Sequence, residues 1–173
     1  MLRENQLLSV PALSDRVCFA VLAIGASGLV AAGLILGDVM RLQPCHLCIL
    51  QRVIYLAFGV VAAGGVVKPG WRRFWCVVLM LVAAGGVVAA GQQSWMQYAP
   101  ELATECGFGE PTLTEQLVNW LGMQWPAMFM VTGFCTQKDW VFLGLSLANW
   151  SVFCFLGLLA GAVWLLLRKK ALR

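Results

Sequence analysis

The strongest constraint on this chain is a run of 21 residues without a charged side chain, from Val17 to Gly37. A helix needs about 20 apolar residues to cross the hydrocarbon core of a bilayer, so this run is long enough. Three more apolar stretches follow at residues 45–67, 74–96 and 140–167. Lipid cannot satisfy backbone polar groups, so each stretch is expected to be helical. The sequence therefore predicts an all-α membrane protein, a four-transmembrane-helix bundle that forms one membrane domain over residues 1–173.

The overall composition agrees with a membrane protein. Of the 173 residues, 61% are hydrophobic and 12% are charged, whereas soluble domains are about half apolar and about a quarter charged. A globule of this length cannot hide such an excess in one core. We therefore expect the lipid bilayer as a partner and no nucleic acid. The same numbers disfavour a disordered chain, a coiled coil and a conventional soluble enzyme.

The basic residues predict the orientation in the membrane. Nine of the twelve lie at the two ends or between the second and third spans, and three lie in the first and third loops or at the adjoining helix ends. Because basic residues concentrate on the cytoplasmic side, both termini are expected in the cytoplasm and the loops at 38–44 and 97–139 outside. The first span is longer than the apolar core of a signal peptide, so we expect it to be retained.

The long third loop is expected to contain one short helix. Thr112 and Glu115 have the spacing of a capping box. Apolar residues follow at helical spacing, which favours a helix lying on the membrane surface over an irregular apolar loop. These apolar residues are Leu113, Leu117, Trp120 and Leu121.

The seven cysteines fall into two groups once the spans are drawn. Three lie within spans, where a cysteine behaves as a small hydrophobic residue: Cys18, Cys76 and Cys154. Four fall on the predicted outer side, where an oxidising compartment would pair them: Cys45, Cys48, Cys106 and Cys135.

Cys45 and Cys48 form a C-x-x-C motif at the predicted start of the second span, directly after Pro44. Such motifs favour a reactive thiolate and reversible exchange. The N-terminal end of the helix adds a favourable potential for an anion. Arg52 lies four residues after Cys48, on the same helix face, where its charge would stabilise a thiolate. This pattern indicates a redox-active pair.

Less specific interpretations remain open at this point. The motif could form half of a zinc site with Cys106 and Cys135, although those two are widely separated in the sequence. Arg52 could be an interfacial residue whose head group extends toward water. His46, between the two cysteines, could tune a thiolate or be a solvated spacer.

A cluster of glutamines stands at the outer end of the third span, where their amides could bind a polar head group or simply line the interface. They are Gln92, Gln93 and Gln97.

Two runs resemble the signatures of one family. The run LQPCHLCILQR at 42–52 and the run GFCTQKDWVFLGL at 133–145 are similar to those of the DsbB family of bacterial disulfide-generating membrane proteins. The resemblance extends over nearly the whole chain and implies a multi-pass protein of the Gram-negative inner membrane with its redox loops in the periplasm. It also implies a protein-dithiol:quinone oxidoreductase that reoxidises a periplasmic DsbA-like thiol oxidase and passes the electrons to the quinone pool, through ubiquinone or menaquinone.

The resemblance also implies individual roles. Cys106 would take the attack of the reduced partner, with Cys135 as its disulfide partner in the resting loop. Cys45, paired with Cys48 at rest, would exchange with Cys135. Cys48 would remain as a thiolate beside the quinone, and Arg52 would hold both. No metal is implied.

The quinone site is expected to include Gln93 and Gln97 beside Arg52. Better-known relatives carry a histidine where this chain has Gln93, and can carry an acid where it has Gln51, so proton transfer by those groups cannot be carried over.

One alternative, from a different class of function, is distinguished by the position of the cysteines. A tetraspanin-like structural protein would use disulfides only to staple its loop, and would need neither a C-x-x-C at the membrane nor an arginine one turn later. Within the enzyme class, a paralogue dedicated to another thiol oxidase and an enzyme similar to vitamin K epoxide reductase stay open as alternatives.

Overall fold

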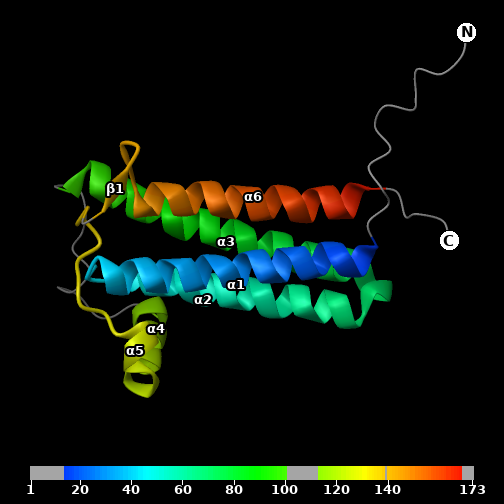
Figure 1. Cartoon of the computed structure of the whole chain (residues 1–173), viewed down its shortest axis with the longest axis horizontal. Helices are drawn as coiled ribbons and strands as arrows, with labels where there is room; N and C mark the ends of the chain where they lie inside the picture. The colour runs from blue at the N-terminus through cyan, green and yellow to red at the C-terminus, as the bar shows by residue number, and fades with distance from the viewer. Residues whose placement is uncertain (1–13, 101–112, 139, 169–173) are drawn as a thin grey trace, which may run out of the picture.

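The computed structural model describes residues 14–100, 113–138 and 140–168, and its main feature is a bundle of four long helices (Figure 1). All four are long and apolar enough to cross a membrane. This confirms the predicted all-α membrane bundle. The helices are α1 (Asp15–Val39), α2 (His46–Val67), α3 (Arg72–Tyr98) and α6 (Leu147–Leu167).

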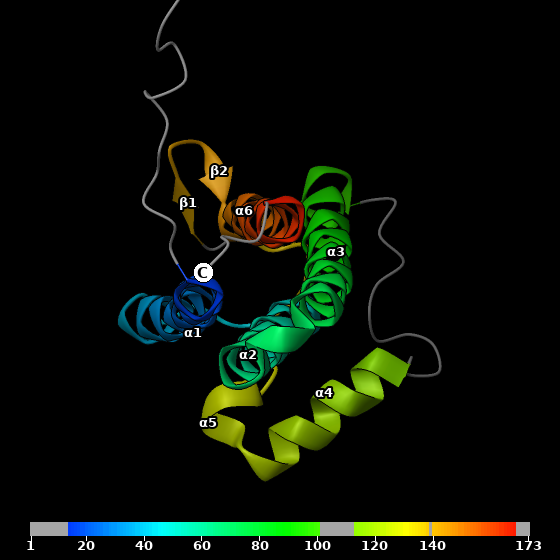
Figure 2. The same ribbon diagram turned by 90° about the vertical axis from the view of Figure 1, so that its right-hand side faces the viewer.

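The four helices pack as a row that curls round on itself (Figure 2). α1 packs on α2, α2 on α3, and α3 on α6, whereas α1 and α6 touch each other far less. A short 3-10 helix, η1 (Pro69–Trp71), joins α2 to α3. The seam between α1 and α6 is therefore the least tightly closed side of the bundle.

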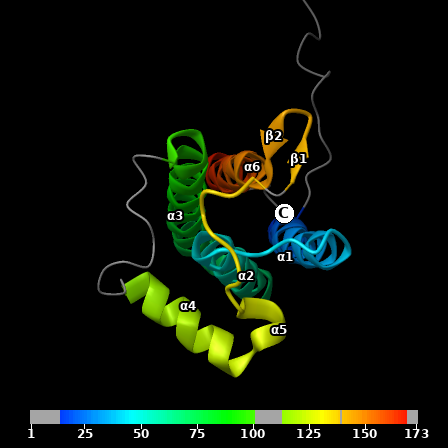
Figure 3. The ribbon, with the colours of Figure 1, turned by 90° about the vertical axis from the view of Figure 1, so that its left-hand side faces the viewer.

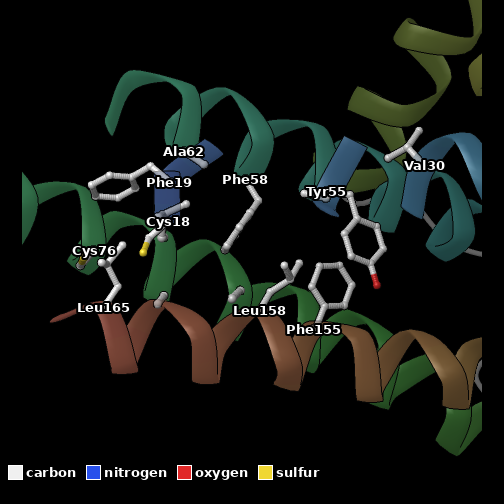
Figure 4. Packing of buried hydrophobic residues seen from close by; sticks show 14 of the residues in the cluster. Cys18, Phe19, Val30, Tyr55, Phe58, Ala62, Cys76, Phe155, Leu158 and Leu165 are labelled. Atoms are coloured by element: carbon white, nitrogen blue, oxygen red, sulfur yellow. The ribbon is translucent and has the colours of Figure 1, made fainter. Parts of the chain in front are cut away.

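Aromatic rings and small residues fill the interior of the bundle (Figure 4). Phe19, Phe58 and Phe155 are fully buried. A Cβ on Gly86 would collide with the Phe155 ring, so α3 and α6 approach each other closely because this position has no side chain. Phe155 also stacks on Tyr55 of α2, with ring centroids 3.9 Å apart.

One end of the bundle is held by charged side chains. Asp15 of α1 accepts a hydrogen bond from Arg168, the residue after α6. The Asp15 Oδ1 atom also lies 3.7 Å from Nη1 of Arg72 in α3. Arg168 also donates to the sulfur of Cys18 at 3.1 Å. These contacts connect three helices at the end opposite the C-x-x-C motif.

Two further helices lie across the start of α2: α4 (Leu113–Gln124) and α5 (Pro126–Phe129) (Figure 3). Val118 of α4 and Phe129 of α5 pack on Ile49 of α2. The short helix predicted in the third loop is therefore present, and its exposed apolar residues include Leu117 and Trp120. The predicted cap, Thr112, lies outside the described residues.

The fourth long helix begins later than the apolar stretch from residue 140 predicts. Strands β1 (Val141–Phe142) and β2 (Leu145–Ser146) pair antiparallel before it. Leu143 and Gly144, which link them, have φ values of 53° and 78°, the backbone of a tight hairpin turn. The Ser146 side chain then accepts a hydrogen bond from the Asn149 N–H and caps α6. The helical part of the predicted span is thus Leu147–Leu167.

Candidate active site

The C-x-x-C motif lies where the chain enters α2. Cys45 is the N-cap residue in an extended conformation, and its sulfur accepts from the Cys48 N–H at 3.4 Å. The two sulfur atoms are 2.9 Å apart. Pro44 favours extended backbone at Gln43, the residue before it, which keeps the helix from starting earlier. The local sequence therefore brings the two thiols together on the first turn of α2.

Cys135 lies beside this pair although it is distant in the sequence. The Cys45 thiol is hydrogen-bonded to Cys135 as well as to Cys48. Cys45 and Cys135 are both buried. Cys45 therefore contacts both partners that a relay through it requires.

Backbone contacts before Cys135 hold it in this place. The N–H groups of Thr132 and Gly133 both donate to the Pro44 carbonyl, at 2.9 and 3.1 Å. A Cβ at Gly133 would collide with the carbonyl oxygen of Gln43. A glycine is therefore needed where this loop crosses the segment before Cys45.

The remaining predicted redox cysteine, Cys106, lies outside the described residues. The Cys106–Cys135 disulfide therefore stays a prediction. The Cys45–Cys48 disulfide also stays a prediction, because both residues are free thiols in this structure. His46 is hydrogen-bonded to Asn119 of α4 at 3.2 Å. It thereby links the first turn of α2 to the helix packed across it.

Gln93 of α3 connects directly to the sulfurs. Its amide Nε2 donates to Cys48 Sγ at 3.0 Å and to Cys45 Sγ at 3.4 Å. Its Oε1 accepts from Nε2 of Gln51 at 2.7 Å. Both glutamines are buried. Sequence reasoning gave Gln51 no role, because the contact joins two helices.

Arg52 and Gln97 have partners of their own. Arg52 is half-buried, and its Nη1 donates to the carbonyl of Met128 at 2.9 Å, so α5 fixes this side chain. Gln97 donates to the Gln137 carbonyl at 2.8 Å and accepts from Ser146 Oγ at 2.6 Å. Gln97 thereby holds the loop after Cys135 and the start of α6 against α3.

A cavity of about 240 Å³ lies against the sulfur site, lined mainly by apolar residues of α1, α2 and α6. Cys48, Arg52 and Gln93 line it. They also line a smaller cavity of about 60 Å³, which extends toward Gln97 and the loop at 134–138. Cys48 is therefore at the junction of an apolar chamber and a more polar one.

The apolar chamber contains hydroxyl groups that sequence reasoning missed. Tyr55 and Ser151 line it, and their hydroxyl oxygens are 3.0 Å apart. Tyr55 lies seven residues after Cys48 and so on the same face of α2. That spacing was a signal in the sequence, whereas Ser151 of α6 had none. Cys154, expected only to fill space, also lines this chamber.

Comparison with known proteins identifies the family. Residues 15–165 match the family described as Disulfide bond formation protein DsbB. The chain belongs to the DsbB family. A Disulfide bond formation protein B from Dechloromonas aromatica is 49% identical over 154 residues, which cover 89% of this chain and 93% of that protein. Proteins of the same name are 40% identical in Aromatoleum aromaticum, covering 92% and 96%, and 37% identical in Nitrosomonas europaea, covering 86% and 93%.

DsbB membership, with four apolar helices, makes this protein a multi-pass protein of the bacterial inner membrane and an oxidoreductase of disulfide bond formation. The resemblance seen in the two sequence runs is thereby confirmed. The C-x-x-C motif and Cys135 lie in contact at one place in the structure, which makes this place the candidate site for thiol–disulfide exchange.

Proposed function

We propose that this protein reoxidises a periplasmic DsbA-type thiol oxidase and passes the electrons to a membrane quinone. The observation that carries the proposal is the position of Cys45. Its sulfur contacts both Cys48 and Cys135, and Cys48 in turn lines an apolar cavity. Thiols from two loops and a chamber for an apolar acceptor thus share one site.

The first exchange forms a disulfide in the partner. A thiolate of the reduced partner attacks Cys106 of the Cys106–Cys135 disulfide, and Cys135 leaves as a thiolate. The partner's second cysteine then attacks the mixed disulfide and releases Cys106. The partner has lost two electrons, and the loop disulfide has gained them.

The second exchange moves those electrons to the membrane. Cys135 attacks Cys45, breaks the Cys45–Cys48 bond and releases Cys48 as a thiolate. Cys106 then attacks Cys135, restores the loop disulfide and releases Cys45. These two steps require that the Cys45 sulfur contact the sulfurs of both Cys48 and Cys135, as it does. The amide of Gln93 is positioned to donate to the released Cys48 sulfur.

The residues around the cavity fit a quinone ring. The lining is mainly apolar, and the guanidinium of Arg52 and the hydroxyls of Tyr55 and Ser151 are polar groups suited to ring oxygens. A quinone in this chamber would supply two-electron acceptance, while the protein supplies placement. Ubiquinone and menaquinone both have an apolar tail, and the loosely packed seam between α1 and α6 offers a route from lipid.

The proposed orientation places the redox loops in the periplasm and both termini in the cytoplasm. The basic residues support it, with nine toward one side and three toward the other. The start of α1 and the end of α6 lie at the same end of the bundle, and the start of α2, where the C-x-x-C motif lies, is at the other end (Figure 1).

The test is direct electron transfer in a purified system. The protein is mixed with a reduced DsbA-type oxidase and a short-tailed ubiquinone, and quinone reduction is followed by absorbance. We expect reduction that depends on both components and is lost in Cys48→Ala. Partner oxidation without quinone reduction would contradict the proposal.

A further inference from the structure

Two buried glutamines form a directed chain that ends on the sulfurs. Gln51 donates to Gln93, and Gln93 donates to Cys48 and Cys45, over distances of 2.7, 3.0 and 3.4 Å. Gln51 and Gln93 are 6% and 4% exposed, so water competes little for these hydrogen bonds. Gln51 belongs to α2 and Gln93 to α3.

We propose that Gln51 is a positioning residue that fixes the Gln93 amide with its NH₂ group toward Cys48. The inference rests on the proposed function, in which Cys48 becomes a thiolate. A thiolate can only accept hydrogen bonds, so the NH₂ end of Gln93 must face it. The oxygen and NH₂ of an amide are similar in size, so packing alone does not select one orientation. The hydrogen bond from Gln51 Nε2 selects the orientation, because this donor requires the amide oxygen of Gln93 as its acceptor.

The hydrogen bonds from Gln51 to Gln93 and from Gln93 to the sulfurs also act on the reduction potential of the Cys45–Cys48 pair. Neither amide titrates, so the donor remains the same whatever the pH. A donor that stabilises the reduced, thiolate form makes the Cys45–Cys48 disulfide easier to reduce, and so a stronger oxidant. Gln51 therefore acts on the potential of a disulfide whose sulfurs it does not contact, through Gln93.

The experiment measures the equilibrium of the Cys45–Cys48 pair with glutathione, without quinone or partner protein. In a Cys106→Ser/Cys135→Ser background, the other two cysteines of the predicted outer side are removed. The Cys45–Cys48 pair then equilibrates with glutathione without exchanging with them. The variants are Gln51→Leu, which removes the donor, and Gln51→Glu measured at a pH where its carboxylate is ionised. An ionised carboxylate only accepts, and so attracts the NH₂ group of Gln93 away from the sulfurs. Gln93→Leu removes the donor to the sulfurs outright.

We expect Gln51→Leu to lower, by about tenfold, the equilibrium constant for oxidation of glutathione by the Cys45–Cys48 disulfide. A tenfold change is the scale of one hydrogen bond to a charged group, and it corresponds to about 30 mV in the reduction potential. Gln51→Glu should lower this constant further. The Gln51→Leu/Gln93→Leu double variant should equal Gln93→Leu alone, because both act through the same hydrogen bond. Gln92→Leu, at an exposed neighbouring position, is the matched control and should change nothing.

Two results would overturn the inference: an unchanged constant in Gln51→Leu while Gln93→Leu shifts it, or additive shifts in the double variant. Thermal unfolding in detergent checks each fold, and Gln51→Met replaces Gln51→Leu if that variant unfolds. A wild-type protein that fails to reduce quinone would instead contradict the proposed function, because the glutathione equilibrium involves no quinone.

Discussion

Arg52, Gln93 and the loop that carries Cys135 are each held in place by a residue from another part of the fold. Arg52 of α2 donates to a carbonyl of α5, Gln93 accepts from α2, and the loop before Cys135 is docked on Pro44. A side chain fixed in this way loses little conformational entropy when it acts. Substitution of a partner should therefore affect the reaction without removing a reactive group.

Arg52 is the residue whose charge should matter most for quinone binding. It is a half-buried cation at the start of a membrane-spanning helix, a costly position that usually reflects function. We expect Arg52→Met to raise the KM for quinone at least about tenfold, as loss of a charged hydrogen bond predicts. Arg52→Lys should recover only part of the lost affinity for quinone, because a compact ammonium keeps the charge but replaces the planar guanidinium.

The measurement is quinone reduction against quinone concentration, with Arg73→Met as control. Arg73 is exposed and lies in the first turn of α3, which begins at the end of the bundle opposite the start of α2. An unchanged KM in Arg52→Met would assign Arg52 to anchoring at the membrane interface instead.

Gly133 should control the transfer between the two loops. In Gly133→Ala the added Cβ meets the Gln43 carbonyl, so the loop carrying Cys135 must move from Cys45. Overpacking of this kind costs about 1–3 kcal/mol, so we expect electron transfer from the protein partner to slow by about tenfold. Quinone reduction fed by a small dithiol at Cys45 and Cys48 should be retained.

Gly91→Ala is the control for this change, because a Cβ there meets nothing within 4 Å. Stopped-flow measurement of the two half-reactions separates the effects. Equal rates in both glycine variants would show that the backbone contact does not position Cys135.

Glycine determines how closely the helices of the bundle approach one another. α3 contains adjacent glycines with opposite surroundings: a Cβ on Gly86 would collide with Phe155, and one on Gly85 would meet nothing within 4 Å. We expect Gly86→Ala to destabilise the bundle by about 1–3 kcal/mol through overpacking. Gly85→Ala should leave stability unchanged or slightly higher, since alanine favours helix.

Denaturant unfolding in detergent micelles compares the two variants. Because Phe155 stacks on Tyr55, which lines the chamber, Gly86→Ala should also weaken quinone binding. Equal stability of the two variants would mean that α3 and α6 adjust their spacing at no cost.

Some elements were predictable from sequence because their cause is local. Hydropathy alone predicted the long helices, and helical spacing predicted α4. The hairpin at 141–146 was missed because its residues are apolar and merge with the span that follows. The Leu143 backbone, with φ of 53°, has no sequence signal. The contact of Cys45 with Cys135, and that of Gln51 with Gln93, depend on packing between distant segments, which periodicity does not report.

The two disulfide exchanges of the protein should be separable. Cys106→Ser should abolish acceptance of electrons from the partner protein, because the first attacked sulfur is gone. Cys45 and Cys48 should still reduce quinone when fed by a small dithiol, since their sulfurs are in contact and Cys48 lines the cavity. Quinone reduction is measured with each donor, and folding by thermal unfolding. Equal loss of both activities in a folded variant would refute the proposed order of exchange.

Orientation in the membrane is the property on which the whole route depends, because the partner is proposed to be periplasmic. The bundle has its cysteine site at one end and the η1 turn with its basic neighbours at the other. A reporter is therefore needed at each end: Gly70→Cys in η1 and Gln124→Cys at the end of α4, both exposed positions.

Because basic residues are retained in the cytoplasm, an impermeant maleimide added to intact spheroplasts should give Gln124→Cys extra labelling over the parent protein, and give Gly70→Cys none. Permeabilised cells should label both, which shows that each thiol is reactive. Labelling of Gly70→Cys in intact spheroplasts would place the cysteine site in the cytoplasm, where thiols are kept reduced, and the proposed exchange with a periplasmic oxidase could not occur.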